Sequence, residues 1–330
     1  MADNNDRLDL IQRLAEKQAR DNGGSLAERA AQKLAVNTEV PPPASGPMPV
    51  APSKEESFPK SAAVQDIPKT ETESEDESPS KQNRYAALDL ERLSQAGFVT
   101  PNSQQTHTAE EFRAVKRPLL LGAFGTGKSK IERGNVILVT SSKPGEGKTF
   151  VSINLALSIA SERDLHVLVI DTDVYRRRLE SELGIDDDRG LVDMLLEDDL
   201  HLPDLLIRTN IPNLSILPVG IRNPQAPELL SSQKMATLMA DIAARYPDRV
   251  IIIDSPPILA SSEASVLAML VGQIVMVVEA NKTDSSELQQ ALKLINTCEN
   301  INFVINKSGS DSGSSPYGSY SYYDEYRQKR

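Results

Sequence analysis

The chain has little cysteine and little histidine. Its 330 residues include one cysteine, Cys298, and three scattered histidines, His107, His166 and His201. A single cysteine excludes an internal disulfide, and the histidines do not have the spacing of a metal-binding motif. We therefore expect a protein of a reducing compartment, the cytoplasm.

Long hydrophobic runs and an excess of positive charge are also missing. No apolar segment approaches the ~18 residues of a membrane span, and Met1 to Gln12 is too polar for a secretory signal. Any position at the inner membrane would therefore depend on a partner. The net charge is -11 and the sequence pI is near 5.0, so we do not expect nucleic acid as the main partner, because phosphate binding needs clustered Lys and Arg.

Composition divides the chain into four predicted regions. Residues 1–39 hold two segments of helical patterning, which fit either a transient solvated helix or a detachable docking segment. Residues 40–84 are rich in Pro, Ser and Glu and are predicted to be a disordered linker, because they contain little apolar surface to bury. Residues 85–307 are the predicted folded domain, and residues 308–330 form a flexible tail rich in Gly, Ser and Tyr.

Strand-like and helix-like segments alternate in the folded region. The strand-like runs are NVILVT, HVLVID, RVIIID, QIVMVVEA and INFVINK. This alternation predicts an α/β fold of the P-loop NTPase type, with a doubly wound, mainly parallel sheet and helices on both faces. In such a sheet, ligands bind at the carboxyl ends of the strands, so the residues after each strand are the candidates for chemistry.

Two glycine-rich segments have the spacing of a phosphate loop. The first, Gly122 to Ser129, satisfies the pattern G-x-x-x-x-G-K-[ST] in full, but it follows only the short run PLLL and leads into a charged segment that ends at Gly134. A helix of fewer than ~12 residues is marginal in water, so no amphipathic helix would follow this loop. We predict a flexible loop here rather than a nucleotide site.

The second segment, SKPGEGKT, has Ser142 in place of the first glycine, but it lies between NVILVT and the helix-like run FVSINLALSIA. A strand, a glycine-rich turn and a helix N-terminus are the setting in which backbone N–H groups surround phosphates. Lys148 is expected to contact the β- and γ-phosphates of ATP, whereas Lys143 either adds a second cation or is solvated. The predicted nucleotide-binding residues are Lys143, Gly145, Glu146, Gly147, Lys148, Thr149 and Phe150.

Aspartates end two of the apolar runs. Asp171 and Asp173 lie at the end of HVLVIDTD, and Asp254 ends RVIIID. Singly, each aspartate could serve as a helix N-cap. Together with GEGKT they favour a magnesium site, because this hard cation is held by a loop hydroxyl, phosphate oxygens, water and carboxylates. The predicted magnesium ligands are Thr149, Asp171 and Asp254.

The three segments VTSSKPGEGKT, VLVIDTD and VIIIDSPPIL resemble the Walker-type motifs of the bacterial protein tyrosine kinases (BY-kinases). The likeness extends from about residue 85 to the C-terminus and implies an ATP-dependent protein-tyrosine kinase. Most of the family has an arginine two positions after the second aspartate, where this chain has Tyr175, and Arg176 is a candidate substitute. The catalytic residues that the resemblance and the motifs indicate are Lys148, Asp171, Asp173 and Asp254.

The end of the chain is a second point of resemblance. Five of the eight tyrosines lie in the last fourteen residues, as in the autophosphorylated tyrosine cluster of that family. The segment AEEFRAVKRPLL is similar to the family's oligomerisation helix through Glu110, Arg113 and Lys116, which implies a homo-oligomer. The predicted phosphoacceptors are Tyr317, Tyr320, Tyr322, Tyr323 and Tyr326.

Short segments point to one branch of the family. KRPLL, LPVG, ELLSS, RYPDR and DSPP resemble the tyrosine autokinases of exosortase-type exopolysaccharide systems. This narrower likeness implies a role in exopolysaccharide synthesis and export. It also implies activation by a membrane chain-length-determinant protein, a polysaccharide co-polymerase.

Transfer to a tyrosine requires removal of a proton, because the phenol pKa is near ~10, and Asp171 or Asp173 is the candidate base. Phosphates gathered on the tail would repel one another and favour the release of subunits. Two other functions share part of this pattern. A deviant Walker A switch ATPase of the partition or cell-division type has the loop and the carboxylates but not the tyrosine tail. A nucleotide-sensing regulator would act through residues 1–84 instead.

Overall fold

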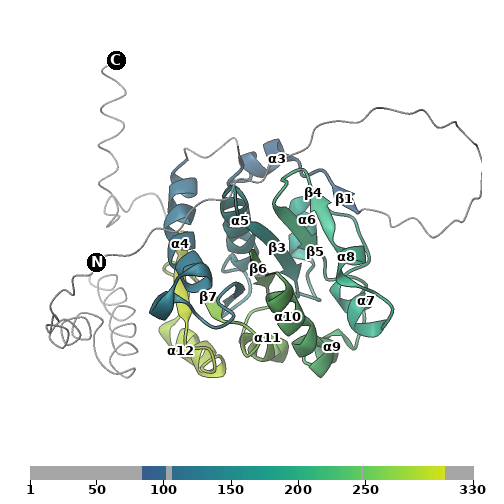
Figure 1. Ribbon diagram of the computed structural model, residues 1–330. Helices are drawn as coiled ribbons and strands as arrows, with labels where there is room; N and C mark the ends of the chain where they lie inside the picture. Colours follow the sequence, from purple (N-terminus) through teal and green to yellow (C-terminus); the bar gives the residue numbers. More distant parts are fainter. Residues whose placement is uncertain (1–83, 102–105, 247, 309–330) are drawn as a thin grey trace, which may run out of the picture. The chain divides into compact units, whose positions relative to one another are not determined.

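The computed structural model describes residues 84–101, 106–246 and 248–308, whose elements are labelled in Figure 1. The predicted N-terminal segment, the linker apart from Arg84, and the tyrosine tail lie outside these residues. The strands are β1 (Tyr85–Ala86), β2 (Val136–Ser141), β3 (His166–Asp171), β4 (Ile207–Thr209), β5 (Leu214–Leu217), β6 (Arg249–Asp254), β7 (Gln273–Glu279) and β8 (Ile301–Asn306). The helices are α3 (Leu90–Gln95), α4 (His107–Phe124), the 3-10 helix η1 (Gly127–Ser129), α5 (Lys148–Ala160), α6 (Arg178–Leu183), α7 (Leu191–Leu196), α8 (Leu202–Leu205), α9 (Ala226–Leu230), α10 (Gln233–Arg245), α11 (Ser262–Ala268) and α12 (Ser285–Leu294).

The strands form one sheet in the order β1-β4-β5-β3-β6-β2-β7-β8. Every neighbouring pair is parallel except β4 and β5. Helices lie on both faces of the sheet in Figure 1, so the predicted α/β fold is confirmed. Strands β6, β2 and β7 lie next to one another, which brings the segments that follow β2 and β6 together at one edge.

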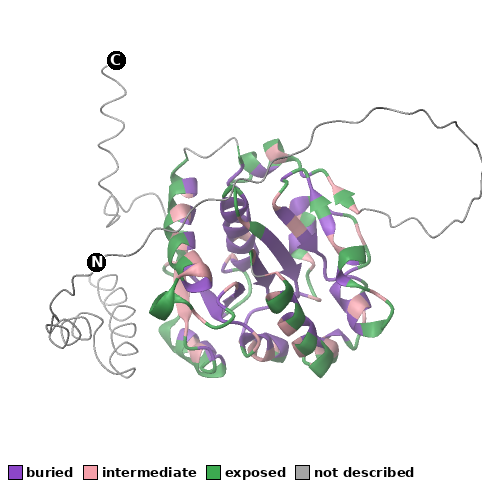
Figure 2. Cartoon of the chain, viewed as in Figure 1, coloured by how far each residue is buried: buried purple, intermediate pink, exposed green. Residues whose placement is uncertain are grey.

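The interior strands are buried on both faces, because their side chains alternate between two hydrophobic cores. In β2, Ile137 and Val139 belong to the core beneath α4 and α5, whereas Val136 and Leu138 belong to the core beneath α10, α11 and α12. The same alternation runs through β3, β6 and β7. Figure 2 shows the central strands buried and the outer faces of the helices exposed. This double burial explains the continuous apolar runs in the sequence.

Helix α4 includes the first three residues of the first glycine-rich segment, so our expectation of a flexible loop was wrong in part. Gly122 lies in the last turn of α4, where a Cβ would meet the Ile131 side chain at 2.7 Å. The buried Gln273 amide donates to Leu119 O at 2.9 Å and to Gly134 O at 2.6 Å, which fixes the end of the helix and the loop after it. This contact joins residues more than 130 positions apart, so local patterning did not reveal it.

Arg84, which composition placed at the end of the linker, is held by the folded domain. Its guanidinium forms an ion pair with Asp187 and donates to Arg189 O at 2.7 Å. Tyr85 follows it in β1, which pairs with β4. The first contacts of the described domain are therefore made one residue before its first strand.

Candidate active site

The second glycine-rich segment has the setting of a phosphate loop: β2 precedes it and α5 follows it. Gly145 and Gly147 have φ values of +94° and +97°, in a region that favours glycine. Such a turn directs successive backbone N–H groups toward one point, as phosphate binding requires. Helix α5 begins at Lys148 with no side-chain cap on Gly147, so the N–H groups of its first turn are available to a ligand.

Glu146 holds the loop from inside. Its buried carboxylate accepts a hydrogen bond from Lys143 N at 2.8 Å and another from the Thr283 hydroxyl, which lies between β7 and α12. The side chain therefore braces the loop rather than facing a ligand. We expected Lys143 either to add a second cation at the phosphates or to be solvated. The Lys143 ammonium instead forms an ion pair with Glu287 on α12, so a contact with phosphate would require this ion pair to open.

The end of β8 also supports the loop. Asn306 Nδ2 donates to Glu146 O at 2.9 Å, and Lys307 Nζ donates to Gly145 O at 2.7 Å. Lys307 has a φ of +58° and pairs with Glu279 at 3.1 Å. The last residues before the predicted tail are therefore hydrogen-bonded directly to the phosphate loop, and no sequence motif had pointed to them.

Lys148 meets a carboxylate. Its Nζ lies 3.0 Å from Asp173 Oδ2, and both side chains are buried. Asp173 belongs to the loop between β3 and α6, so this ion pair joins two of the three predicted motifs. A buried pair of this kind is costly to break by removal of one partner alone.

Asp171 and Asp254 lie directly opposite each other on the adjacent strands β3 and β6. Burial raises the pKa of Asp254 to about 6, although Lys148 and hydrogen bonds from Thr149 and Ser152 oppose the shift. Burial also raises the pKa of Asp171 well above its usual range, and the nearby Glu180 and Asp254 carboxylates add to this effect. The positive charge of Lys148 therefore does not offset the burial of the two carboxylates.

The two aspartates also have unused oxygens. Asp171 Oδ1 accepts from Asp173 N at 2.8 Å and Asp254 Oδ1 accepts from the Ser152 hydroxyl at 2.9 Å, but the Oδ2 atoms of both are buried without a partner among the described residues. Buried unpartnered carboxylate oxygens beside the Thr149 hydroxyl fit a hard divalent cation. Within the described ranges, no group of three or more His, Cys, Asp or Glu side chains could hold a metal by itself, so a magnesium ion here would also need phosphate oxygens and water.

Phe150 contributes differently from the other loop residues. Its ring packs against Phe98 and Phe112, with centroid distances of 5.1 and 6.4 Å. The side chain thus packs α5 against the preceding segments. Only the backbone of Phe150, in the first turn of α5, is placed to contact a nucleotide.

Sequence reasoning missed Glu180 and Glu263. Glu180, on α6, accepts from Val219 N at 3.0 Å and lies close enough to Asp171 to share a proton, although Glu180 Oε2 has no donor partner among the described residues. Glu263, on α11, lies 3.3 Å from the Tyr175 hydroxyl. Both glutamates are buried, and each lies in a short helix that follows a strand ending in aspartate. Their position shortly after these strands was the only feature of the sequence that could have indicated them.

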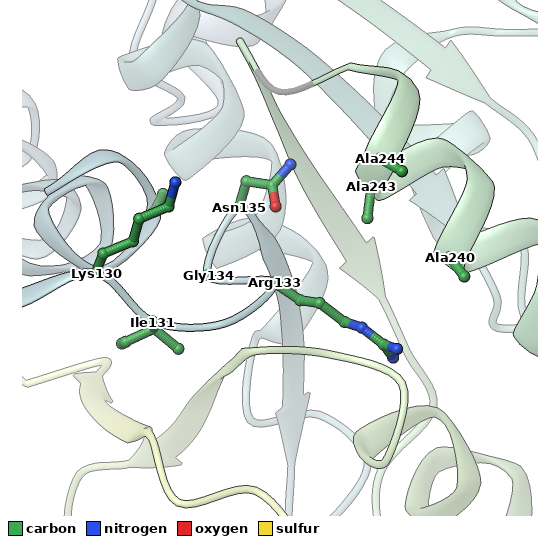
Figure 3. A pocket seen from close by; sticks show the side chains of 9 residues that line it. Lys130, Ile131, Arg133, Gly134, Asn135, Ala240, Ala243 and Ala244 are labelled. Atoms are coloured by element: carbon green, nitrogen blue, oxygen red, sulfur yellow. The ribbon is translucent and has the colours of Figure 1, made fainter. Parts of the chain in front are cut away.

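The first glycine-rich segment lies at the opposite edge of the sheet. η1 precedes β2, whereas the second segment follows β2, so the six residues of the strand separate them by about 20 Å. A pocket of about 380 Å³ opens at this edge between the loop before β2 and α10, with Lys130 and Arg133 on one side and alanines of α10 on the other (Figure 3). No helix follows η1 before β2, so the segment lacks a helix N-terminus that could face phosphates.

The predicted oligomerisation residues divide into two kinds. Glu110 and Arg113 form an ion pair on the surface of α4. Lys116 is buried: its Nζ donates to Ser158 O at 2.7 Å and lies 2.6 Å from Glu162 Oε1. Lys116 therefore holds α4 on the end of α5 within one chain and is not exposed for a second chain.

The parallel sheet, the glycine-rich loop after a central strand and the facing aspartates on adjacent strands define a P-loop nucleotide-binding protein. A family model described as an AAA domain matches residues 134–308. Across the described ranges, no helix combines the length and the apolar character that a bilayer span requires.

Relatives narrow this class, and they show that the chain belongs to the bacterial tyrosine-protein kinase family. It is 30% identical over 236 residues to tyrosine-protein kinase YwqD of Bacillus subtilis, covering 71% of this chain and 95% of that protein. It is 32% identical over 160 residues to tyrosine-protein kinase Wzc of Salmonella typhimurium, covering 48% of this chain and 22% of that protein.

Two solved structures have a similar fold. The kinase domain of Escherichia coli tyrosine kinase ETK gives a TM-score of 0.50 at 27% identity, covering 55% of this chain and 70% of that one. The chimerical protein CapA2B2 gives a TM-score of 0.54 at 23% identity, covering 64% of this chain and 96% of that one, and supports the fold alone.

Proposed function

We propose that the protein is an ATP-dependent protein-tyrosine autokinase that phosphorylates the tyrosines of its own C-terminal tail. The observation that carries this proposal is the convergence of three motifs: Lys148 of the loop meets Asp173, while Asp171 faces Asp254 across adjacent strands. Membership of the tyrosine-kinase family supports the same activity. The five proposed acceptors are Tyr317, Tyr320, Tyr322, Tyr323 and Tyr326, which lie outside the described residues.

In this proposal the loop backbone and Lys148 bind the phosphates of ATP. The ammonium of Lys148 moves from Asp173 toward the β- and γ-phosphates, where it stabilises the charge that develops during transfer. Thr149, Asp171 and Asp254 would hold magnesium together with phosphate oxygens and water. When bound, this ion supplies charge neutralisation on the phosphates.

The contact between Lys148 and Asp173 supports the assignment of Asp173 as the base. In the described state its Oδ2 is occupied by the Lys148 ammonium. Once Lys148 turns to phosphate, Asp173 becomes free to accept the proton of an incoming tyrosine hydroxyl. Asp171 is the less suitable base, because burial and the neighbouring carboxylates already favour its protonated form through a raised pKa.

We also propose a homo-oligomer in the cytoplasm, placed at the inner membrane by a membrane chain-length-determinant protein that activates the kinase. Glu110 and Arg113 on the exposed face of α4 support a contact between copies, whereas Lys116 does not. The resemblance to exosortase-associated autokinases supports a role in exopolysaccharide synthesis and export. Phosphate on the tails would weaken assembly by repulsion within an acidic protein.

The test is incubation of the purified full chain with ATP and magnesium, followed by mapping of phosphosites by mass spectrometry. Phosphate is expected on tail tyrosines of the parent chain and absent from a Lys148→Met chain. Asp173→Asn should slow transfer by about 10²-fold without weakening nucleotide binding, because Lys148 then has no carboxylate to leave before it contacts phosphate. ATP hydrolysis without phosphotyrosine, even after addition of the partner's cytoplasmic segment, would instead favour a switch ATPase.

A further inference from the structure

The pocket at the amino edge of the sheet has no role in the proposed function. It has a volume of about 380 Å³ and lies between the segment before β2 and helix α10 (Figure 3). Pockets that bind small ligands measure about 300–1,000 Å³, so this one has room for a small molecule. Strand β2 separates it from the second glycine-rich segment, so a ligand here and a nucleotide there would occupy different spaces.

Two cationic side chains line this pocket. Lys130 and Arg133 are exposed, and neither side chain forms a hydrogen bond or an ion pair with another described residue. In Figure 3 the Arg133 side chain extends from the loop toward the α10 side of the pocket. The one carboxylate of the same segment, Glu132, is not among the residues that line the pocket. In a chain of net charge -11, this local positive charge favours a negatively charged ligand.

The segment that carries these cations is fixed by the fold. The buried Gln273 amide donates to Gly134 O at 2.6 Å, and Asn135 Nδ2 donates to Arg249 O at 3.1 Å. These contacts hold the backbone directly after Arg133. The cation therefore starts from an ordered backbone, and a ligand would lose little affinity to the ordering of the loop.

Arg133 also has an unfavourable backbone conformation. Its φ is +53°, in the left-handed region that non-glycine residues rarely adopt. Glycine adopts this conformation without steric cost, so stability alone would favour glycine at position 133. An arginine that is strained, exposed and unpaired within the described part of the chain indicates a role in binding rather than in folding.

The opposite wall of the pocket is uncharged. Ala240, Ala243 and Ala244 of α10 line it, and Asn135 adds an amide from the start of β2. A guanidinium and an ammonium are the groups that bind phosphate oxygens most strongly, the guanidinium by paired hydrogen bonds. The alanine wall offers only apolar contact, so it suits the uncharged body of a ligand.

We propose that this pocket binds the phosphate or diphosphate group of a small soluble ligand, with Lys130 and Arg133 as the residues that hold the anion. The phosphate oxygens accept hydrogen bonds from both side chains, and the body of the ligand lies against α10. This mode differs from that of a phosphate loop, because side chains take the place of backbone N–H groups at a helix N-terminus. Anionic lipid headgroups offer the same chemistry, so vesicles are a separate arm of the experiment.

The first arm titrates the full chain, labelled with ¹³C at its alanine methyl groups, with inorganic pyrophosphate at constant ionic strength. We expect saturable shifts of the methyl signals of Ala240, Ala243 and Ala244. Ala280 follows β7 at the opposite edge of the sheet and reports on the second glycine-rich segment. An absence of saturable shifts on α10 would overturn the proposal. Shifts that follow the same curve as Ala280 and vanish in Lys148→Met would also overturn it.

Charge variants test the two cations. Lys130→Ala and Arg133→Gly should each weaken pyrophosphate binding about tenfold. Lys128→Ala is the matched control, because Lys128 is exposed in the same segment but does not line the pocket, and it should weaken binding less than about twofold. Equal losses in Lys128→Ala and Lys130→Ala would overturn the proposal, since general electrostatic attraction would then explain the binding.

Unfolding in urea separates binding from folding at Arg133. Arg133→Gly removes the left-handed strain, so its unfolding midpoint should be at or above that of the parent. A lower midpoint would overturn the role of Arg133, because the side chain would then support the fold. Ala243→Leu fills the pocket without a change in charge and should abolish the shifts of Ala240 and Ala244, and unchanged pyrophosphate affinity in this variant would overturn the site.

The second arm measures sedimentation of the chain with vesicles of phosphatidic acid and phosphatidylcholine, against vesicles of phosphatidylcholine alone. Pyrophosphate shifts on α10 without sedimentation support a soluble ligand. Sedimentation that is lost in Lys130→Ala and Arg133→Gly, with no pyrophosphate shift on α10, would overturn the proposal in favour of a membrane surface.

Discussion

The contact between Gly147 and Asn306 makes a quantitative prediction for the phosphate loop. Gly147 has a φ of +97°, and an alanine Cβ would lie 2.0 Å from Asn306 Nδ2. To reach the 3.4 Å of ordinary contact, the Asn306 amide has to move away and lose its hydrogen bond to Glu146 O. Gly147→Ala therefore combines backbone strain with the loss of a support of the loop.

The magnitude follows from these two effects. A non-glycine residue in the left-handed region costs about 1–2 kcal/mol, and a lost hydrogen bond about 0.5–1.5 kcal/mol. We expect Gly147→Ala to lower the free energy of unfolding by about 2–3 kcal/mol. Gly145→Ala is the matched control, because its φ is +94° but no atom lies within 4 Å of the added Cβ. It should lose only the strain, about 1–2 kcal/mol.

Urea unfolding followed by circular dichroism measures the free energy of unfolding of both variants. Titration with a fluorescent ADP measures the nucleotide affinity of the phosphate loop. Asn306→Ala removes the clash, so the double variant with Gly147→Ala should lose about 1 kcal/mol less than the sum of the single losses. A Gly147→Ala chain that is no less stable than Gly145→Ala, with unchanged nucleotide affinity, would refute this reasoning.

Three further predictions address other parts of the molecule. Lys116→Met should lower the free energy of unfolding in urea by about 1–3 kcal/mol, because it leaves Ser158 O without the donor Lys116 Nζ. Glu162→Gln should lower it by less than about 1 kcal/mol, since Glu162 is half exposed. Equal losses in the two variants would contradict this account. The folded pKa of Asp254, about 6, lies above its unfolded value, so this group's contribution to stability falls as pH rises from about 4 to about 6 and is level above that. The free energy of unfolding of Asp254→Asn, relative to that of the parent, should thus rise by about 1 kcal/mol between pH 5 and pH 7.5. Thermal unfolding without nucleotide or magnesium measures this difference, and a difference independent of pH would exclude the titration of Asp254. Chelation of magnesium should weaken ADP binding about tenfold in a fluorescence titration, and Thr149→Val should abolish most of that difference; a variant as magnesium-dependent as the parent would remove Thr149 from the ion's ligands.

The sheet and the motif positions could be predicted because they depend on local patterning. Apolar runs indicated the buried strands, and the aspartates at their ends were expected at the carboxyl edge, where Asp171 and Asp254 do lie opposite each other. The supports of the site were not predictable in this way. Asn306 reaches the loop across 160 residues, and Glu180 reaches Val219 across 39.

Short elements were also missed, for a related reason. β4 and β5 have three and four residues, and their antiparallel pairing interrupts an otherwise parallel pattern. Too few residues alternate in such strands to produce a clear period. The two glycine-rich segments, in contrast, could be distinguished from the sequence by the strand-like and helix-like runs around them. The first segment precedes β2 and the second follows it, so they lie at opposite edges of the sheet.

The contacts of Lys307 with Gly145 and of Asn306 with Glu146 couple nucleotide binding at the phosphate loop to the position of the chain at Lys307. Tyr317 lies ten positions after Lys307 in the sequence, and a chain of ten residues extends at most ~36 Å. Because the phosphate loop and the origin of this tether share hydrogen bonds, a nucleotide that orders the loop also fixes the point from which the tyrosines extend. By reciprocity, any ligand that displaces Lys307 would change nucleotide affinity by the same factor by which the nucleotide changes the affinity for that ligand.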